Sequence, residues 1–130
     1  MEWYVISVKT GREEDVQNRL NARFSESFFS LVPKKSLIEK RQGKTNRVIE
    51  KLFPGYVFIR TNMDRNKFKR INRMTGVVKL VSADTDYSRV DDNEMAVILK
   101  LINKDGIIEC SKLLKENSKI TVLEGSLLGM

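Results

Sequence analysis

The first part of the chain combines a β-branched and aromatic run with a helical stripe. The run Trp3–Lys9 has the composition of a buried strand. Apolar residues then recur at every fourth position, at Val16, Leu20 and Phe24. This spacing predicts an amphipathic helix. Thr10 followed by Glu13 matches a capping box, so we expect the helix to start directly after the strand.

Two further strands are predicted in the middle of the chain, joined by a polar turn. Apolar and polar residues alternate from Ser36 to Arg41, and the segment RQGKTN then supplies turn residues. The segment RVIEKLFPGYVFIRT returns, so we expect a long antiparallel hairpin with a basic tip. Pro54-Gly55 should kink or bulge the returning strand, because proline cannot donate to the ladder.

The second half of the chain predicts two more helices. Asp64 suits the N-cap of a helix with Phe68 and Ile71 on its apolar side, and Gly76 ends it. A strand over VVKLVS, a loop over DTDYSRVDD and a helix over NEMAVILKLINK follow. The order β-α-β-β-α-β-α predicts an α+β fold of ferredoxin-like character, an antiparallel sheet flanked by helices.

We expect three parts along the chain. Residues 1–104 would form one domain, and residues 105–117 a linker with some local structure. Residues 118–130 would contribute the first strand and turn of a second, incomplete domain, since a strand with nothing to pair with is marginal.

Composition weakens the enzyme hypothesis. The 130 residues include no histidine and a single cysteine, Cys110. Histidine is the commonest general base and metal ligand, and one cysteine supports neither a disulfide nor a zinc cluster. No Gly-rich phosphate loop is present. We therefore expect no catalysis, no metal, no cofactor and no small-molecule substrate.

No apolar run approaches the roughly 18 residues of a membrane helix, and the N-terminus has no secretion-signal pattern. A cytoplasmic protein without a membrane partner is expected.

Charge points to a polyanionic partner. The chain has 24 basic and 17 acidic residues, a net charge of +7, which favours nucleic acid. Thirteen of the basic residues lie in residues 34–51 and 60–73. Lys67, Arg70 and Arg73 are expected to share one helix face, with Lys69 beside it. The alternative is that these charges only cover a solvated surface. Neither segment shows a repeated exposed aromatic, so no base-stacking platform is predicted.

Four motifs occur in one order: WYVISVKTGREEDV, LFPGYVFI, TGVVKLV and ITVLEGSLLGM. Together they resemble the NusG family of transcription elongation factors. Residues 1 to about 104 resemble the NusG N-terminal (NGN) domain. Residues from Ser118 resemble the opening of a KOW β-barrel, with Gly125 and Gly129 at its turn.

Within this family, the basic stretch VPKKSLIEKRQGKTNRVIEKLFPGYVFI resembles the specialised paralogs of the LoaP group and, more distantly, RfaH. That resemblance implies processive antitermination on selected operons. The LoaP resemblance further implies that the N-terminal domain binds an RNA hairpin in the transcribed leader.

The resemblance also implies docking on the clamp helices of the largest RNA polymerase subunit. The matching positions are Tyr4, Phe53, Tyr56 and Phe58. Strand alternation predicts that Tyr56 and Phe58 share one face, opposite Val57 and Ile59. Phe53 lies beyond Pro54, where the alternation cannot be followed. Core packing is the alternative for each aromatic, and Trp3 is expected in the core.

Basic positions supply the candidate nucleic-acid contacts. They are Lys9, Arg12, Lys34, Lys35, Lys40, Arg41, Lys44, Arg47, Lys67, Lys69, Arg70 and Arg73. By resemblance to RfaH, Lys9 faces DNA and residues 67–70 meet the non-template strand. RfaH has small polar residues at these positions, whereas this chain has KFKR. This difference favours contact with the nucleic-acid backbone over a base-specific pocket. A general NusG-like elongation or pausing factor that contacts DNA, and a ribosomal-type RNA-binding module, remain alternatives.

Overall fold

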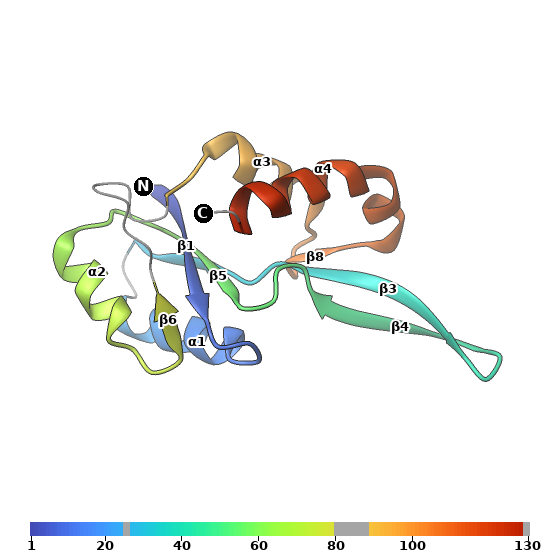
Figure 1. The fold of residues 1–130 in the computed structure, drawn as a ribbon, viewed down its shortest axis with the longest axis horizontal. Coiled ribbons are helices and arrows are strands. Elements are labelled where there is room, and N and C mark those ends of the chain that lie inside the picture. Colours follow the sequence, from blue (N-terminus) through green and yellow to red (C-terminus); the bar gives the residue numbers. More distant parts are fainter. Residues whose placement is uncertain (25–26, 80–88, 129–130) are drawn as a thin grey trace. The chain divides into compact units, whose positions relative to one another are not determined.

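The structure, a computed structural model, describes residues 1–24, 27–79 and 89–128. The chain divides into two compact units, and each has its own sheet (Figure 1). The first unit consists of residues 1–32 and 54–95, and the second of residues 33–53 and 96–130.

The sheet of the first unit is antiparallel and has five strands: β1 (Glu2–Val8), β2 (Phe29–Leu31), β5 (Tyr56–Thr61), β6 (Val77–Lys79) and β7 (Arg89–Val90). The strand order is β2-β5-β1-β6, and β7 also pairs with β1. β1 and β5 pair along almost their whole lengths and lie side by side in Figure 1. The order of elements confirms the predicted α+β fold.

Helices α1 (Glu13–Arg23) and α2 (Arg65–Asn72) contribute to one core with the sheet. The core cluster comprises Tyr4, Ile6, Val8, Val16, Leu20, Phe24, Phe28, Val32, Val57, Ile59, Ile71 and Met74. The predicted stripe of α1 is thus confirmed. Asp64 Oδ1 accepts a hydrogen bond from Lys67 N at 2.7 Å, which confirms the predicted N-cap of α2.

The capping box predicted at α1 is wrong. Arg12 is the N-cap residue and makes no side-chain cap bond. Glu13 is instead 1% exposed, and its Oε1 accepts from Gly11 N at 2.7 Å. Its Oε2 accepts from Gly55 N at 2.9 Å. Gly55 has a φ of +85°, and a Cβ there would lie 3.3 Å from Thr10 Oγ1. One carboxylate therefore ties the β1–α1 turn to the Pro54-Gly55 turn.

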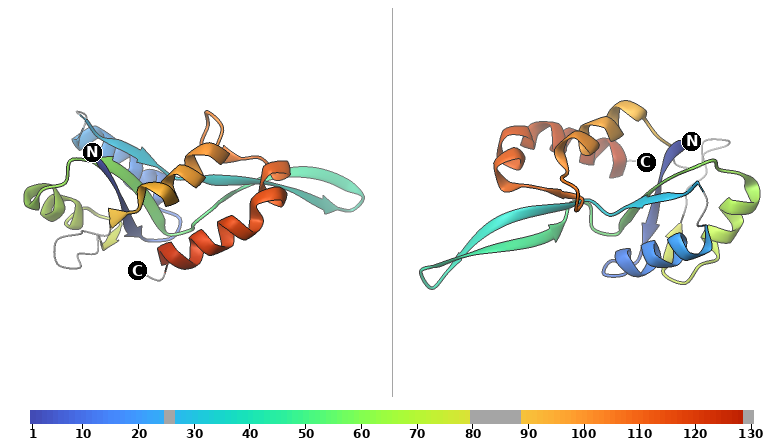
Figure 2. Two further views of the ribbon diagram at one scale, coloured as in Figure 1. Left: turned by 90° about the horizontal axis from the view of Figure 1, so that it is seen from above. Right: turned by 180° about the vertical axis from the view of Figure 1, so that it is seen from behind.

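The second unit is built on the predicted hairpin. β3 (Lys34–Arg41) pairs antiparallel with β4 (Lys44–Lys51) over all eight positions, a twisted ribbon in Figure 2. Gln42 and Gly43 both have positive φ, as a two-residue hairpin turn requires. β8 (Ile107–Ile108) pairs in parallel with the first two residues of β3.

The returning strand is not continuous, contrary to the prediction. β4 ends at Lys51, and β5 begins at Tyr56 in the other sheet. Proline cannot donate to a ladder and Gly55 has left-handed φ, so the chain breaks pairing here instead of bulging. β7 also lies where a loop was predicted, because pairing with Trp3 and Tyr4 of β1 stabilises it.

The C-terminal region also differs from the prediction. β8 lies in the segment expected to be a linker, and Ile108 is buried. Helix α3 spans Asp92–Leu101, and α4 spans Cys110–Leu128 with a kink at Glu116. The strand expected from Ser118 onward is therefore helical. A helix satisfies its own backbone groups, whereas an isolated strand leaves them unpaired. None of the helices within the described residues is long and apolar enough to cross a membrane.

Candidate nucleic-acid interface

The outward side of α2 carries a line of cations. Arg65, Lys69 and Arg73 are exposed and follow one another at four-residue spacing. Four residues advance a helix by about 6 Å, so their charges form a row along its surface. Arg65 was not selected from the sequence, although its spacing from Lys69 is a helical signal. We call these three residues the α2 row.

Lys67 lies outside the α2 row and is less exposed than its members. Its side chain is half-buried, and its Nζ donates to Thr61 Oγ1 at 2.9 Å and to Asn62 O at 2.7 Å. It therefore fastens the end of β5 to α2. Arg70 is exposed, but its guanidinium lies 4.6 Å from the ring centroid of Phe24, a cation–π contact.

These contacts predict different effects on stability for Lys67 and Lys69. We expect Lys67→Ala to lower the free energy of unfolding by about 1 kcal/mol, because two hydrogen bonds from a half-buried ammonium are lost. Lys69→Ala is the matched control and should change it little, since Lys69 is exposed. Urea denaturation followed by circular dichroism measures both, and equal midpoints would contradict the assignment.

A second group of cations surrounds the turn after α2. Lys9 N donates to Gly76 O at 2.9 Å, and Arg19 Nη1 donates to Thr75 O at 3.2 Å. A Cβ at Gly76 would lie 3.9 Å from Arg12 Cβ, so Arg12 also adjoins this turn. We call Lys9, Arg12, Arg19 and Arg73 the turn cluster. Asp15 lies 3.8 Å from Arg12 and 3.3 Å from Arg19, and offsets part of the charge.

Arg19 was missed by the sequence reasoning. Its spacing of four residues from Asp15 is a local signal for a surface ion pair and for nothing more distant. Only the folded structure places its guanidinium at Thr75 O, next to the carbonyl that accepts from Lys9 N.

Three exposed cations of the hairpin lie at its tip. Lys40, Arg41 and Lys44 are all exposed beside the Gln42-Gly43 turn. Arg41 makes an exposed ion pair with Glu39 at 3.2 Å, a contact of small energy. Lys34 and Lys35, at the base of the hairpin, are half-buried.

Arg47 has a structural contact that the sequence did not reveal. Its Nη2 donates to Glu109 Oε1 at 2.9 Å, and its Nε donates to Ser36 Oγ at 2.9 Å. Glu109 also accepts from Asn103 Nδ2 at 3.2 Å. Arg47, Glu109 and Cys110 contribute to the lining of a pocket of about 440 Å³. Arg47 is therefore a weaker candidate for phosphate contact than the cations of the tip.

The aromatic candidates for polymerase docking lie deeper than expected. Register places Tyr56 opposite Ser7 and Phe58 opposite Val5, so these two aromatics do share a face. However, Phe58 is only 1% exposed, which favours the core-packing alternative for this residue. Tyr4 and Phe53 are also buried. Tyr56 is half-buried and is the most accessible of the four.

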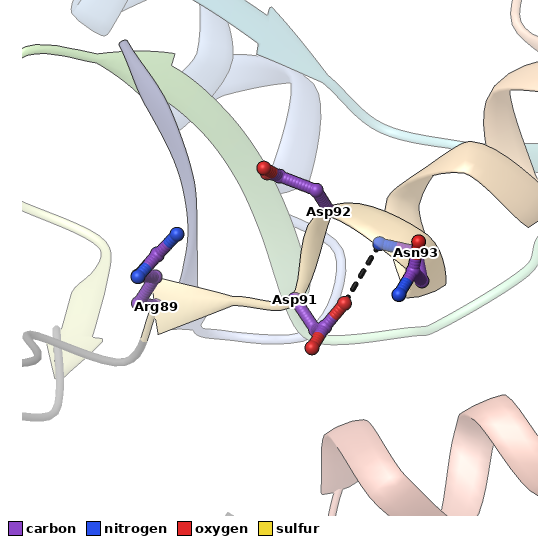
Figure 3. A pocket seen from close by; sticks show the side chains of 4 residues that line it. All are labelled: Arg89, Asp91, Asp92 and Asn93. Atoms are coloured by element: carbon purple, nitrogen blue, oxygen red, sulfur yellow. Dashed lines mark hydrogen bonds between the residues drawn. The ribbon is translucent and has the colours of Figure 1, made fainter.

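A pocket of about 470 Å³ at the start of α3 is lined by Arg89, Asp91, Asp92 and Asn93 (Figure 3). Asp91 Oδ1 accepts from Asn93 N at 2.7 Å and so caps the helix. The two carboxylates disfavour a phosphate here. Within the described ranges, no cluster of His, Cys, Asp or Glu could hold a metal ion.

Fold and charge together define a basic α+β domain of ferredoxin-like type. A family model described as transcription termination factor NusG matches residues 1–99. The chain therefore belongs to the NusG family of transcription factors, and its fold is that of the NusG N-terminal domain.

Named relatives and a solved structure agree with this placement. The transcription termination/antitermination proteins NusG of Rickettsia typhi and Helicobacter pylori are 24% and 22% identical. The alignments cover 95% and 96% of this chain and 68% and 75% of those proteins. A solved structure of Thermotoga maritima NusG, concerned with domain interaction, aligns with a TM-score of 0.56 and 27% identity. The alignment covers 76% of this chain and only 55% of the Thermotoga maritima chain.

Proposed function

We propose that the protein is a processive antitermination factor that binds RNA polymerase and an RNA hairpin transcribed from selected operons. The observation that carries this proposal is the exposed cation cluster of Lys40, Arg41 and Lys44 at the hairpin tip. Phosphate contacts require positive charge and hydrogen-bond donors, and side chains at a ribbon tip can approach a duplex without steric hindrance. The resemblance to the LoaP group supports the choice of RNA.

Polymerase binding is the second part of the proposal. We assign it to the surface around Tyr56 at the start of β5, with the clamp helices of the largest polymerase subunit as the partner. Binding that is tighter to the closed clamp would shift the polymerase toward that state. No substrate is chemically changed; the protein acts by bridging polymerase and nascent RNA.

The turn cluster favours one alternative, a general elongation or pausing factor that contacts DNA. Its residues Lys9, Arg12 and Arg19 adjoin the turn that follows Arg73, and all four are basic. Transcription in vitro on unrelated templates separates the two functions. Equal antitermination on every template would favour the general factor, and dependence on one leader would favour the proposal.

The proposal predicts that the protein binds a leader RNA hairpin more tightly than a scrambled RNA of equal length. Binding should weaken with a salt slope of about −0.9 per phosphate contact on a duplex. A gel shift at several salt concentrations measures both quantities. Equal affinity for the two RNAs would remove the hairpin-specific part. Failure to co-purify with RNA polymerase would favour the ribosomal-type module, although NusG family membership argues against it.

We further propose, from the sequence motifs, that residues 118–130 begin a KOW domain after an N-terminal domain of residues 1–104 and a segment of residues 105–117. The helical state of residues 118–128 in α4 would then have to change to a strand in a complete barrel.

A further inference from the structure

Strand pairing places two aromatic residues and one arginine in a row across three strands. Trp3 of β1 is directly opposite Arg60 of β5, and Arg60 is directly opposite Phe29 of β2. Directly opposite residues of antiparallel strands point to the same face, with Cβ atoms about 5 Å apart. Phe29 is 56% exposed and Arg60 is exposed. Trp3 was expected in the core, but it is only half-buried.

This row lies on the face of the sheet that α1 and α2 do not cover. The residues that alternate with it, such as Tyr4 and Ile59, belong to the core cluster with those helices. Ser30, between Phe29 and Leu31, donates from its Oγ to Asn21 Oδ1 of α1 at 2.8 Å. Phe29 therefore points away from the helices.

The chemistry of the row suits an unpaired nucleobase. Aromatic rings and the guanidinium plane both stack on bases, and sheet surfaces present such groups to single-stranded RNA. The same face bears Val5, Ser7, Leu31, Tyr56 and Phe58 besides the row. Arg60 is the only charged residue among these eight, and the register places it between the two aromatic residues.

We propose that Trp3, Arg60 and Phe29 form a stacking site for unpaired bases of single-stranded RNA. This site rests on the proposed function and deepens it: the hairpin tip would hold phosphates of the paired stem, and the row would hold bases of an adjoining loop or single strand. An exposed arginine that the register places between two aromatic residues, in a protein of net charge +7, favours RNA over an apolar protein surface.

Trp3 provides a direct signal, because it is the only tryptophan of the chain. A short unstructured oligouridylate should quench Trp3 fluorescence, since a stacked base lies against the indole. A fully paired RNA duplex of the same length, which offers no unpaired base, should leave the fluorescence nearly unchanged.

Three variants test the site. Phe29→Ser should weaken oligouridylate binding by about five- to a hundredfold, the usual range for one base–aromatic stack. Arg60→Lys keeps the charge but loses the stacking plane, and should weaken binding severalfold. Val78→Ser is the control, because Val78 is 60% exposed on β6, the opposite edge strand of the same sheet, and it should bind like the parent protein. Circular dichroism checks that each variant is folded.

The outcomes separate this site from the proposed function. Unchanged oligouridylate affinity in both Phe29→Ser and Arg60→Lys, or no quenching of Trp3, overturns the stacking site even where the leader hairpin still binds. If either variant no longer co-purifies with polymerase but keeps its RNA affinity, the row is a protein-docking surface. That result also overturns the stacking site. Failure of the parent protein to bind any RNA overturns the proposed function as well.

Discussion

Replacing Lys40, Arg41 and Lys44 with glutamate is expected to weaken binding of the leader RNA hairpin by about a hundredfold at low salt. Contact with one phosphate contributes roughly 1 kcal/mol, and each reversal also adds repulsion. The salt slope should decrease in magnitude by about 2 to 3, since about 0.9 is lost with each of three contacts. A gel shift over a salt series measures both changes.

The fold should tolerate this triple replacement. All three side chains are exposed, and the positive φ values at the turn belong to Gln42 and Gly43, which are kept. The one ion pair lost, between Arg41 and Glu39, is exposed and contributes little to stability. Reduced binding can therefore be attributed to the lost charge.

The control carries the same change of net charge elsewhere in the same unit. Lys100, Lys104 and Lys112 are exposed and lie outside the hairpin. Their replacement with glutamate should reduce hairpin affinity much less than the change at the tip. An equal reduction would show that only net charge matters and would contradict a specific surface. Co-purification with polymerase should survive both changes if the two binding surfaces are distinct.

Replacing Glu13 with alanine is expected to lower the free energy of unfolding by about 3 kcal/mol or more. Hydrogen bonds to charged groups contribute about 1.5–3 kcal/mol each, and Glu13 accepts two from backbone N–H groups. Its removal also leaves a buried donor, Gly55 N, without this acceptor. Glu13→Gln should be intermediate, because one amide oxygen cannot serve both donors.

Urea denaturation measures this effect, and Glu50→Ala provides a matched removal of an acid. Glu50 is exposed on β4, so its loss should change stability by less than about 0.5 kcal/mol. Equal stability of the Glu13 and Glu50 variants would contradict the role of the buried carboxylate. Tyr56 follows Gly55 directly, so polymerase binding by the Glu13 variant should weaken together with its stability.

The elements with a strong local period could be predicted from the sequence. Val16 and Leu20 at helical spacing identified α1, and Asp64 identified the start of α2. Alternation in β5 correctly separated Val57 and Ile59 from Tyr56 and Phe58. The basic hairpin tip followed from turn residues and composition. Each of these signals depends only on the residue and its near neighbours.

Contacts between distant segments could not be predicted in this way. Glu13 looked like a local cap, but its second partner is Gly55 across the fold. Lys67 looked like a surface cation of α2, but Thr61 and Asn62 hold it. Phe58 was placed on the correct face, but whether that face is covered depends on what else packs there.

The sequence by itself therefore determined the helices and strands with a strong local period, the apolar faces of those elements, and where positive charge gathers. Periodicity reports the two sides of one element because side chains repeat every 3.6 or 2.0 residues. Only the tertiary structure decided the register that aligns Trp3, Arg60 and Phe29, and the partners that engage Glu13 and Lys67. Strand pairing and side-chain hydrogen bonds join residues far apart in the chain, and no local pattern specifies which distant residue will be the partner.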